Sequence, residues 1–199
     1  KQGAAVHVAT VGSPAVEPTI RKALAIGADE GIRIDAEPAD GLFVARQLAE
    51  VVKNGGYNVI IAGRESIDYN GGMVPGMMAS MLDMNFINTC ISLEIEGNKA
   101  TAVREIDGGK ETLETTLPLI IGGQKGLVEE SDLRIPNMRG IMMARKKTLH
   151  VKAAVEAFGR IDILVNNAGF DRPGTIAKID AGDFLEVLGI HLVVPFVLI

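Results

Sequence analysis

Residues 57–76 read Tyr-Asn-Val-Ile-Ile-Ala-Gly-Arg-Glu-Ser-Ile-Asp-Tyr-Asn-Gly-Gly-Met-Val-Pro-Gly. The first six residues form a mostly apolar run, which is typical of a parallel strand covered on both faces. A glycine-containing loop follows, and Pro75 suits the first turn of a helix after it. In an open α/β sheet, ligands bind beyond the carboxyl ends of the strands, where glycines let backbone N–H groups approach a phosphate. The stretch therefore suits a nucleotide phosphate, and it suits equally well a loop that only turns the chain.

The segments before this stretch continue an alternation of strands and helices. Residues 5–11 and 31–34 are short apolar runs that predict buried strands. A helix is predicted between them, with Pro18 in its first turn and Gly27 at its end. Asp40 is placed to cap a second helix that leads to the strand at residue 57. Strands that alternate with helices imply an α/β fold with a parallel sheet.

The pattern changes after a helix expected over residues 75–82. Three segments in which apolar and polar residues alternate follow: residues 91–96, 100–106 and 110–116. The tight-turn residues Gly97-Asn98 and Asp107-Gly108-Gly109 join them. These turns predict an antiparallel β-meander. A further buried strand is expected over residues 118–121, and a helix is expected to begin near Val151.

Composition excludes several classes of protein. The 199 residues carry a net charge of −5, with 47% hydrophobic and 23% charged residues, which fits a globular protein rather than a disordered one. The acidic balance argues against broad nucleic-acid binding, and no apolar run approaches the ~20 residues of a membrane-spanning helix. The single cysteine, Cys90, leaves too few thiolates for a structural zinc site and is expected to be a buried hydrophobe. The three histidines have no metal-ligand spacing, so neither a metal site nor catalytic residues are predicted.

Two further stretches carry a family resemblance. Residues 102–113 read Ala-Val-Arg-Glu-Ile-Asp-Gly-Gly-Lys-Glu-Thr-Leu, and residues 117–121 read Leu-Pro-Leu-Ile-Ile. With the loop at residues 63–74, they make residues 4–149 resemble the β (small) subunit of electron transfer flavoproteins, especially bacterial members. The resemblance implies a Rossmann-like domain related to adenine nucleotide alpha hydrolases. It also implies a cytoplasmic electron-carrier subunit that performs no bond chemistry itself.

The same resemblance implies a cofactor and partners. The subunit would hold AMP, or a second FAD in electron-bifurcating members, and would form a heterodimer with an α subunit that carries the redox-active FAD. Electrons would arrive from acyl-CoA dehydrogenase-type donors, as in fatty acid β-oxidation. The resemblance places the following residues at the nucleotide, and they lie at the ends of two strands or in the loop: Val11, Gly12, Gly63, Ser66, Asp68, Gly71, Gly72, Met73 and Val74.

The loop departs from the AMP-binding pattern of the family. Gly72-Met73-Val74 stands where those members typically carry Asn-Gln-Thr, so side-chain hydrogen bonds to phosphate are lost and backbone donors should dominate. Val74 followed by Pro75-Gly76 is more similar to the bifurcating form. The choice between AMP and FAD stays open.

Three residues are expected to bind partners. Ile135, next to Pro136, falls at the recognition loop of the family, where an apolar side chain anchors in a pocket of the partner dehydrogenase. From the sequence alone, Ile135 also fits an ordinary core residue. Glu105 stands where members use a carboxylate to pair with an arginine during partner exchange, and otherwise it is a charged strand residue.

The end of the chain resembles a different family. Residues 158–169 read Phe-Gly-Arg-Ile-Asp-Ile-Leu-Val-Asn-Asn-Ala-Gly and are similar to the middle of a short-chain dehydrogenase. The cofactor loop and the Ser, Tyr and Lys of that family are missing, and His191 stands in place of its catalytic asparagine, so we expect no reductase activity. The predicted domains are residues 1–149, nucleotide-binding, and residues 150–199, a dehydrogenase-like fragment of a chimeric chain. The alternatives are an NAD(P)-dependent short-chain dehydrogenase and a non-redox nucleotide-binding module.

The nucleotide-binding part is expected to be incomplete at its start. Family members begin with a strand and a helix, so roughly 30 or more residues of a βαβ unit would be absent. That strand is central in folds of this kind, and its neighbours should expose unpaired backbone groups. We therefore expect a marginally stable chain that binds nucleotide poorly on its own.

Overall fold

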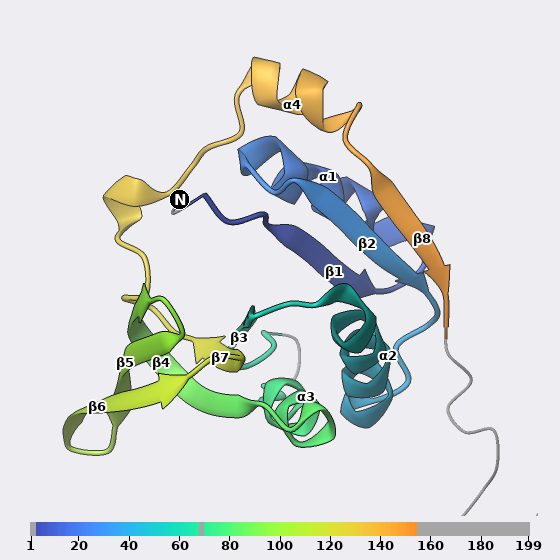
Figure 1. The fold of residues 1–199 in the computed structure, drawn as a ribbon. Coiled ribbons are helices and arrows are strands. Elements are labelled where there is room, and N and C mark those ends of the chain that lie inside the picture. The colour runs from blue at the N-terminus through green and yellow to red at the C-terminus, as the bar shows by residue number, and fades with distance from the viewer. Residues whose placement is uncertain (1–2, 68–69, 155–199) are drawn as a thin grey trace, which may run out of the picture. The chain divides into compact units, whose positions relative to one another are not determined.

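A computed structural model describes residues 3–67 and 70–154 of the chain. The first half contains β1 (His7–Val11), η1 (Pro14–Val16), α1 (Glu17–Ile26), β2 (Glu30–Asp35), α2 (Gly41–Gly55), β3 (Val59–Gly63) and α3 (Val74–Leu82). The second half contains β4 (Asn85–Glu96), β5 (Lys99–Ile106), β6 (Gly109–Thr116), β7 (Leu119–Gly123), η2 (Glu130–Asp132), α4 (Met138–Ala144) and β8 (Leu149–Ala153). The expected mixed α/β fold with a parallel sheet and a meander is confirmed (Figure 1).

The helices begin and end where their capping residues predict. Pro18 lies in the first turn of α1, and Gly27 ends that helix with a φ of 133°, which a residue with a Cβ rarely adopts. The Asp40 carboxylate accepts a hydrogen bond of 2.7 Å from Phe43 N and so caps α2. Gly56 ends α2 in the left-handed conformation. The predicted cap at Asp40 is confirmed.

The strands form two separate sheets. One sheet has three parallel strands in the order β1-β2-β8, and the other has five in the order β3-β7-β4-β5-β6. In the second sheet β3, β7 and β4 are parallel, whereas β4, β5 and β6 form the antiparallel meander. β1 has only β2 as a strand partner, and β3 has only β7, among the residues that the structure describes.

β7 lies at the centre of the larger hydrophobic core. Leu119, Ile120 and Ile121 are completely buried. Leu119 and Ile121 pack with residues of β4 and β5, while Ile120 packs on the opposite face with α2 and α3, which lie side by side in Figure 1. The buried strand predicted over residues 118–121 is confirmed.

Two of the strands predicted to be buried are partly exposed. Residues 5–11 and 57–62 are not covered on both faces: Ile61 in β3 is 66% exposed, and His7 and Ala9 in β1 are exposed. The physical reason is that, among the residues that the structure describes, β1 pairs only with β2 and β3 pairs only with β7, so side chains near the free edges stay in water.

β4 begins six residues earlier than the meander predicted at residue 91. Its first residues pair in parallel with β7, and its later residues pair antiparallel with β5. A bulge lies between the two parts, and Thr89 there adopts a φ of 52°, an unusual value for a β-branched residue. The bulge lets one strand serve both the parallel layer and the meander.

The helix expected near Val151 is wrong for residues 151–153, because β8 occupies residues 149–153 and pairs with β2. The outer edge of β2 offers backbone partners that a helix would leave unpaired. β8 crosses the boundary predicted between residues 149 and 150, and that boundary stays a prediction. The dehydrogenase-like stretch at residues 158–169 and His191 lie outside the described residues. Within the described part of the chain, no helix is long and apolar enough to cross a membrane.

Candidate functional site

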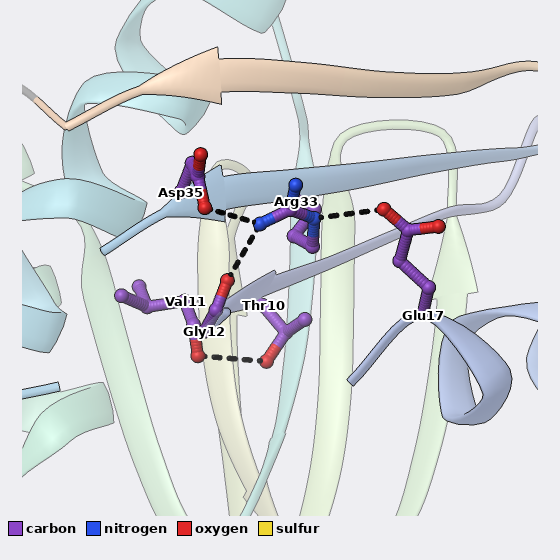
Figure 2. A network of polar contacts seen from close by, with 6 residues as sticks. All are labelled: Thr10, Val11, Gly12, Glu17, Arg33 and Asp35. Carbon is purple, nitrogen blue, oxygen red and sulfur yellow. Dashed lines mark hydrogen bonds and ion pairs between the residues drawn. The ribbon is translucent and has the colours of Figure 1, made fainter. Parts of the chain in front are cut away.

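The carboxyl ends of β1 and β2 are joined by a buried arginine (Figure 2). Arg33 of β2 is 4% exposed, and its Nη1 donates to Gly12 O at 2.9 Å and to Asp35 Oδ1 at 2.6 Å. Its Nε donates to Glu17 Oε1, at the start of α1, at 3.2 Å. Gly12 N in turn donates to Ile34 O at 3.0 Å. Both backbone polar groups of Gly12 are therefore held, which fixes the turn that follows β1.

The negative charges around Arg33 compensate for the cost of burying its guanidinium group. The hydrogen bond to Asp35 raises the pKa of Arg33 above its ordinary value, burial opposes this, and the negative charges of Asp35 and Glu17 raise the pKa further. Arg33 thus stays charged with its donors directed at protein acceptors, and it positions Gly12 rather than presenting a free cation to a ligand. The sequence prediction missed this residue, although a charged residue inside the apolar run 31–34 was a signal.

Ser66 and Gly71 close the loop that follows β3. Ser66 N donates to Gly71 O at 2.9 Å, and Gly71 N donates to Ser66 Oγ at 3.1 Å. Gly63, the last residue of β3, is exposed at the mouth of this loop. Asp68 lies outside the described residues. The structure therefore brings together Gly63, Ser66 and Gly71 of the predicted site.

The loop leads into an open helix N-terminus. Met73 occupies the N-cap position of α3, is 64% exposed and makes no side-chain hydrogen bond to the helix. Val74 is the first residue of α3. A Cβ on Gly72 would lie 3.1 Å from Arg64 O, so the backbone there passes close to the start of the loop. Uncapped N–H groups and the helix dipole favour an anion at this end.

Arg64 ties the loop to the end of β7. Its Nη1 donates to Gln124 Oε1 at 2.9 Å, and its Nη2 donates to Glu65 Oε1 at 2.7 Å. Arg64 N also donates to Gly123 O at 3.0 Å. The sequence prediction did not include Arg64, because only the neighbouring strand reveals its partners.

The predicted site residues lie in two segments of the described structure, the turn after β1 and the loop after β3. A cleft of about 240 Å³ is lined by His7 and Ala9 of β1 and by Ala62 and Val74 at the two ends of that loop. That the two segments bind one nucleotide stays a prediction.

The residues expected to bind partners lie on the surface. Ile135 is 84% exposed and Pro136 is exposed, so the alternative of Ile135 as a core residue is wrong for this part of the chain. Glu105, near the end of β5, lines a surface pocket of about 530 Å³ together with Lys110 and Lys125. The partner roles of Ile135, Pro136 and Glu105 stay predictions.

The remaining candidate residues have ordinary surroundings. Cys90 is completely buried, and burial raises the pKa of its thiol, so it is the small hydrophobe that the sequence predicted. Residues 3–67 and 70–154 contain no group of three or more His, Cys, Asp or Glu side chains that could hold a metal ion.

A family model and curated relatives match the part of the chain that the structure describes. A model of the electron transfer flavoprotein domain matches residues 1–157. Electron transfer flavoprotein subunit beta of Syntrophomonas wolfei is 37% identical over 160 residues, which cover 80% of this chain and 62% of the relative. The Bacillus subtilis and human proteins of the same name are 36% and 34% identical and are each covered over 58% of their length.

The chain belongs to the electron transfer flavoprotein domain family. It spans about three fifths of the length of these curated relatives. A model of short chain dehydrogenases matches residues 141–199, which confirms the second resemblance found in the sequence. The first match includes the loop after β3, the bulged β4 and the meander, so the elements described above are family elements.

Proposed function

We propose that this chain is the nucleotide-binding and docking part of an electron transfer flavoprotein small subunit. It holds an adenine nucleotide, AMP or FAD, at the loop after β3, and pairs with an α subunit that carries the redox-active FAD. The observation that carries the proposal is the family match over residues 1–157, which includes that loop. If AMP is bound, it is structural, and the flavin of the α subunit supplies the electron transfer.

The residues at the loop fit a nucleotide phosphate. The N-terminus of α3 has no side-chain cap, and the glycines at 71 and 72 let the backbone approach an anion. Pro75 in the first turn of α3 removes one of the available N–H donors. Gly72 and Met73 would hold the phosphate through backbone N–H groups, while Gly71 N donates to Ser66 Oγ and so keeps the loop closed beside them.

Partners would bind on other surfaces of the same unit. Ile135 and Pro136 form the apolar anchor for a dehydrogenase of the acyl-CoA type, and Glu105 pairs with an arginine during exchange between partners. The exposure of Ile135, at 84%, supports an anchor that is buried only in a complex. A location in the bacterial cytoplasm completes the proposal.

Co-expression tests this function. The chain is produced with a tagged large subunit of a bacterial electron transfer flavoprotein, and the purified material is analysed for flavin absorbance and for extracted nucleotide by chromatography. We expect a yellow complex of both chains with AMP or FAD beyond the flavin of the large subunit. A large subunit that purifies without this chain, or a complex without the additional nucleotide, would contradict the proposal.

Electron transfer from an acyl-CoA dehydrogenase is measured on the same complex. Ile135→Asp places a charge at the anchor and should lower the rate at least about tenfold, which corresponds to the cost of one lost apolar anchor. The matched control is Val151→Asp, because Val151 is another exposed β-branched apolar residue, at 53%, and it lies in β8 rather than at a proposed partner residue. Equal rates for both variants would contradict the role of Ile135. NADPH oxidation in the absence of the large subunit would instead favour the dehydrogenase alternative.

A further inference from the structure

A cluster of basic side chains surrounds α4. Residues 133–147 contain no Asp or Glu. Five basic residues lie among them: Arg134, Arg139, Arg145, Lys146 and Lys147. α1 packs against α4 and adds Arg21 and Lys22 to the same surface. The whole chain has a net charge of −5, so positive charge is concentrated here against the overall balance. A local excess of one sign favours a partner of the opposite sign.

The carboxyl ends of α1 and α4 are each capped by a cation from the other segment. Arg21 Nη1, from α1, donates to Ala144 O at 2.7 Å and to Lys147 O at 2.8 Å, at the end of α4. Lys147 Nζ donates in return to Leu24 O at 3.0 Å and to Ala28 O, at the end of α1. Cations at these positions satisfy free carbonyls and complement the helix dipole. α4 has only seven residues, too few for a stable isolated helix, so these contacts hold it against α1.

The two helices also approach each other closely. A Cβ on Gly140 would lie 2.6 Å from Ala25 O, so a side chain there would push the helices apart. Ala144, one turn later, is 2% exposed and packs with Ile20 and Leu24 of α1. The surface beside this contact therefore has a fixed shape, and little order has to be gained when it binds a partner.

A surface groove of about 520 Å³ lies between α1 and α4. Its lining is mainly apolar and comes from both helices and from the segment before α4: Pro18, Ala25, Pro136, Ile141 and Ala144. No Asp or Glu of the described residues lines it. Ile135, directly before Pro136, is 84% exposed. The groove is thus continuous along the chain with the apolar anchor proposed at Ile135.

Three cations line the same groove: Arg21, Lys22 and Arg145. Lys22 and Arg145 are exposed, and Arg21 is half-buried. Among residues 3–67 and 70–154, no carboxylate forms an ion pair with any of the three. The groove thus combines apolar side chains with uncompensated positive charge. This combination is complementary to an apolar segment that carries carboxylates along its borders.

We propose that this surface, named here the α1–α4 groove, binds an acidic amphipathic segment of a partner protein beside the anchor at Ile135. The inference rests on the proposed function, because it adds a second contact for the partner that Ile135 anchors. Apolar side chains of the segment cover Ala25 and Ile141, and its carboxylates pair with Lys22 and Arg145. Such pairs at an exposed rim fix the orientation of a partner and speed its association.

Charge favours this occupant over the alternatives. A nucleic acid or an anionic membrane presents an extended negative surface, which a chain of net charge −5 repels outside the groove. In a symmetric dimer with the groove on its axis, Lys22 and Arg145 would face the same cations of the second copy, and like charges in contact oppose association. A short acidic segment meets only the positive groove.

Two helical peptides test the charge requirement on the chain alone. The first carries leucines on one face and glutamates along both borders of that face, and the second has glutamine in place of every glutamate. Fluorescence anisotropy of the labelled peptides measures their affinities at low and at physiological salt. We expect the glutamate peptide to bind saturably, and the glutamine peptide to bind at least about tenfold more weakly at low salt. Equal affinities, or no binding of either peptide, would overturn the proposal.

Charge reversal of the groove separates ion pairing from damage to the fold. The double variant Lys22→Glu, Arg145→Glu should bind the glutamate peptide at least about tenfold more weakly. It should bind a third peptide, in which lysine replaces every glutamate, more tightly than the unaltered chain does. Lys53→Glu is the matched control, because Lys53 is an exposed lysine in the last turn of α2 and should leave the affinities unchanged. Weaker binding of all three peptides by the double variant, or an equal effect of the control, would contradict ion pairing in the groove.

Hydrogen exchange locates the bound peptide. The amides of α1 and α4 should exchange more slowly when the glutamate peptide is bound. Slower exchange only in α2 or in the meander would place the peptide elsewhere and overturn the proposal. A chain that is dimeric without peptide, and that the glutamate peptide dissociates, would identify a second copy as the occupant and would also overturn it.

Electron transfer to the complex with the large subunit separates a failure of this inference from a failure of the proposed function. The double variant should raise the KM of the acyl-CoA dehydrogenase for the complex at least about tenfold and leave kcat within about twofold, since the groove contributes to docking alone. An unchanged KM in an active complex would overturn the groove as a docking site while the proposed function stands. A large subunit that never binds this chain would contradict the proposed function, and the peptides would still decide whether the groove binds an acidic segment.

Discussion

β3 and β7 have almost the same sequence and pair with each other residue by residue. Val-Ile-Ile-Ala-Gly of β3 lies in register with Leu-Ile-Ile-Gly-Gly of β7, so that Ile61 is the direct neighbour of Ile121. Ile121 is completely buried, whereas Ile61 is 66% exposed. β7 has β3 on one side and β4 on the other, and β3 has β7 alone. Burial in this protein thus depends on the number of strand neighbours, which the local sequence does not encode.

The same comparison distinguishes the region around β7, whose strands have neighbours on both sides, from the region around β1 and β3, whose strands have a neighbour on one side among the described residues. β7 and the meander form a core in which Leu119 and Ile121 pack with buried residues of β4 and β5. The region around β1 and β3 has apolar side chains beside two strand edges that no described strand covers. We expect variants in the two regions to differ in the same way.

The largest difference is expected between Ile121→Ala and Ile61→Ala. Truncation of the buried Ile121 leaves a cavity and should lower the free energy of unfolding by about 2–5 kcal/mol. Truncation of the exposed Ile61 should cost less than about 1 kcal/mol. Urea denaturation followed by circular dichroism measures both, and equal costs would mean that β3 is covered in solution.

A second pair of variants uses glycines near the carboxyl ends of the two strands. A Cβ on Gly122 of β7 would overlap Asn88 Oδ1, a buried oxygen without a hydrogen-bond partner, whereas a Cβ on Gly63 of β3 would lie 3.5 Å from its nearest neighbour, Glu65 O. Gly122→Ala should therefore cost about 1–3 kcal/mol, and Gly63→Ala should be nearly neutral. Asn88→Ala combined with Gly122→Ala should recover most of the loss. Without that recovery, the overlap with Asn88 is not the cause.

The loops after the two strands also differ. The loop after β3 ends at the uncapped N-terminus of α3, and Met73 there offers a phosphate no side-chain donor. Met73→Gln should raise the affinity of the chain for AMP up to about tenfold, which is the effect of one added hydrogen bond of about 1 kcal/mol. Isothermal titration measures the change. The control is Met142→Gln in α4, where Met142 is equally exposed at 64% and should leave the affinity unchanged.

The smallest effect on stability is expected at Tyr57, which lies two residues before β3. Burial, and secondly the negative charge of Glu30, raise the pKa of Tyr57 above its ordinary value. The folded state therefore holds the phenol proton more tightly than the unfolded state, in which tyrosine ionises near about pH 10. The contribution of Tyr57 to stability is present below about pH 10 and is lost as the pH rises above it. Tyr57→Phe should show a shallower loss of stability between about pH 9 and 11, and identical slopes would contradict this.

Local signals in the sequence predicted α1, α2, α3 and the turns of the meander, whereas α4 was not predicted and the helix expected near Val151 was wrong for residues 151–153. Asp40, Gly27 and the turn residues of the meander act on their immediate neighbours, so a pattern of a few residues is sufficient to place them. The glycine-containing loop was also predicted, and the structure closes it through Ser66 and Gly71. Contacts between distant segments were not predictable in this way.

Three features illustrate what required the structure. The first part of β4 has polar Asn85 and Asn88, and it is a strand because β7 offers it a parallel neighbour. β8 exists because the outer edge of β2 is available to it. Arg33 is buried because Glu17, Asp35 and Gly12 O surround it from three segments. Each depends on a partner far away in the sequence or on the opposite side of a turn.

Residue-resolved amide hydrogen exchange of β3 and β7 tests most directly whether the sheet is open between β1 and β3. The amide of Ile121 lies inside the larger sheet and should exchange only when the whole unit unfolds. The amide of Ile61 faces the free edge and should exchange at least about a hundredfold faster, through local opening. Equal protection of Ile61 and Ile121 in the chain alone would show that β3 already has a second neighbour, and the open strand position would then be contradicted.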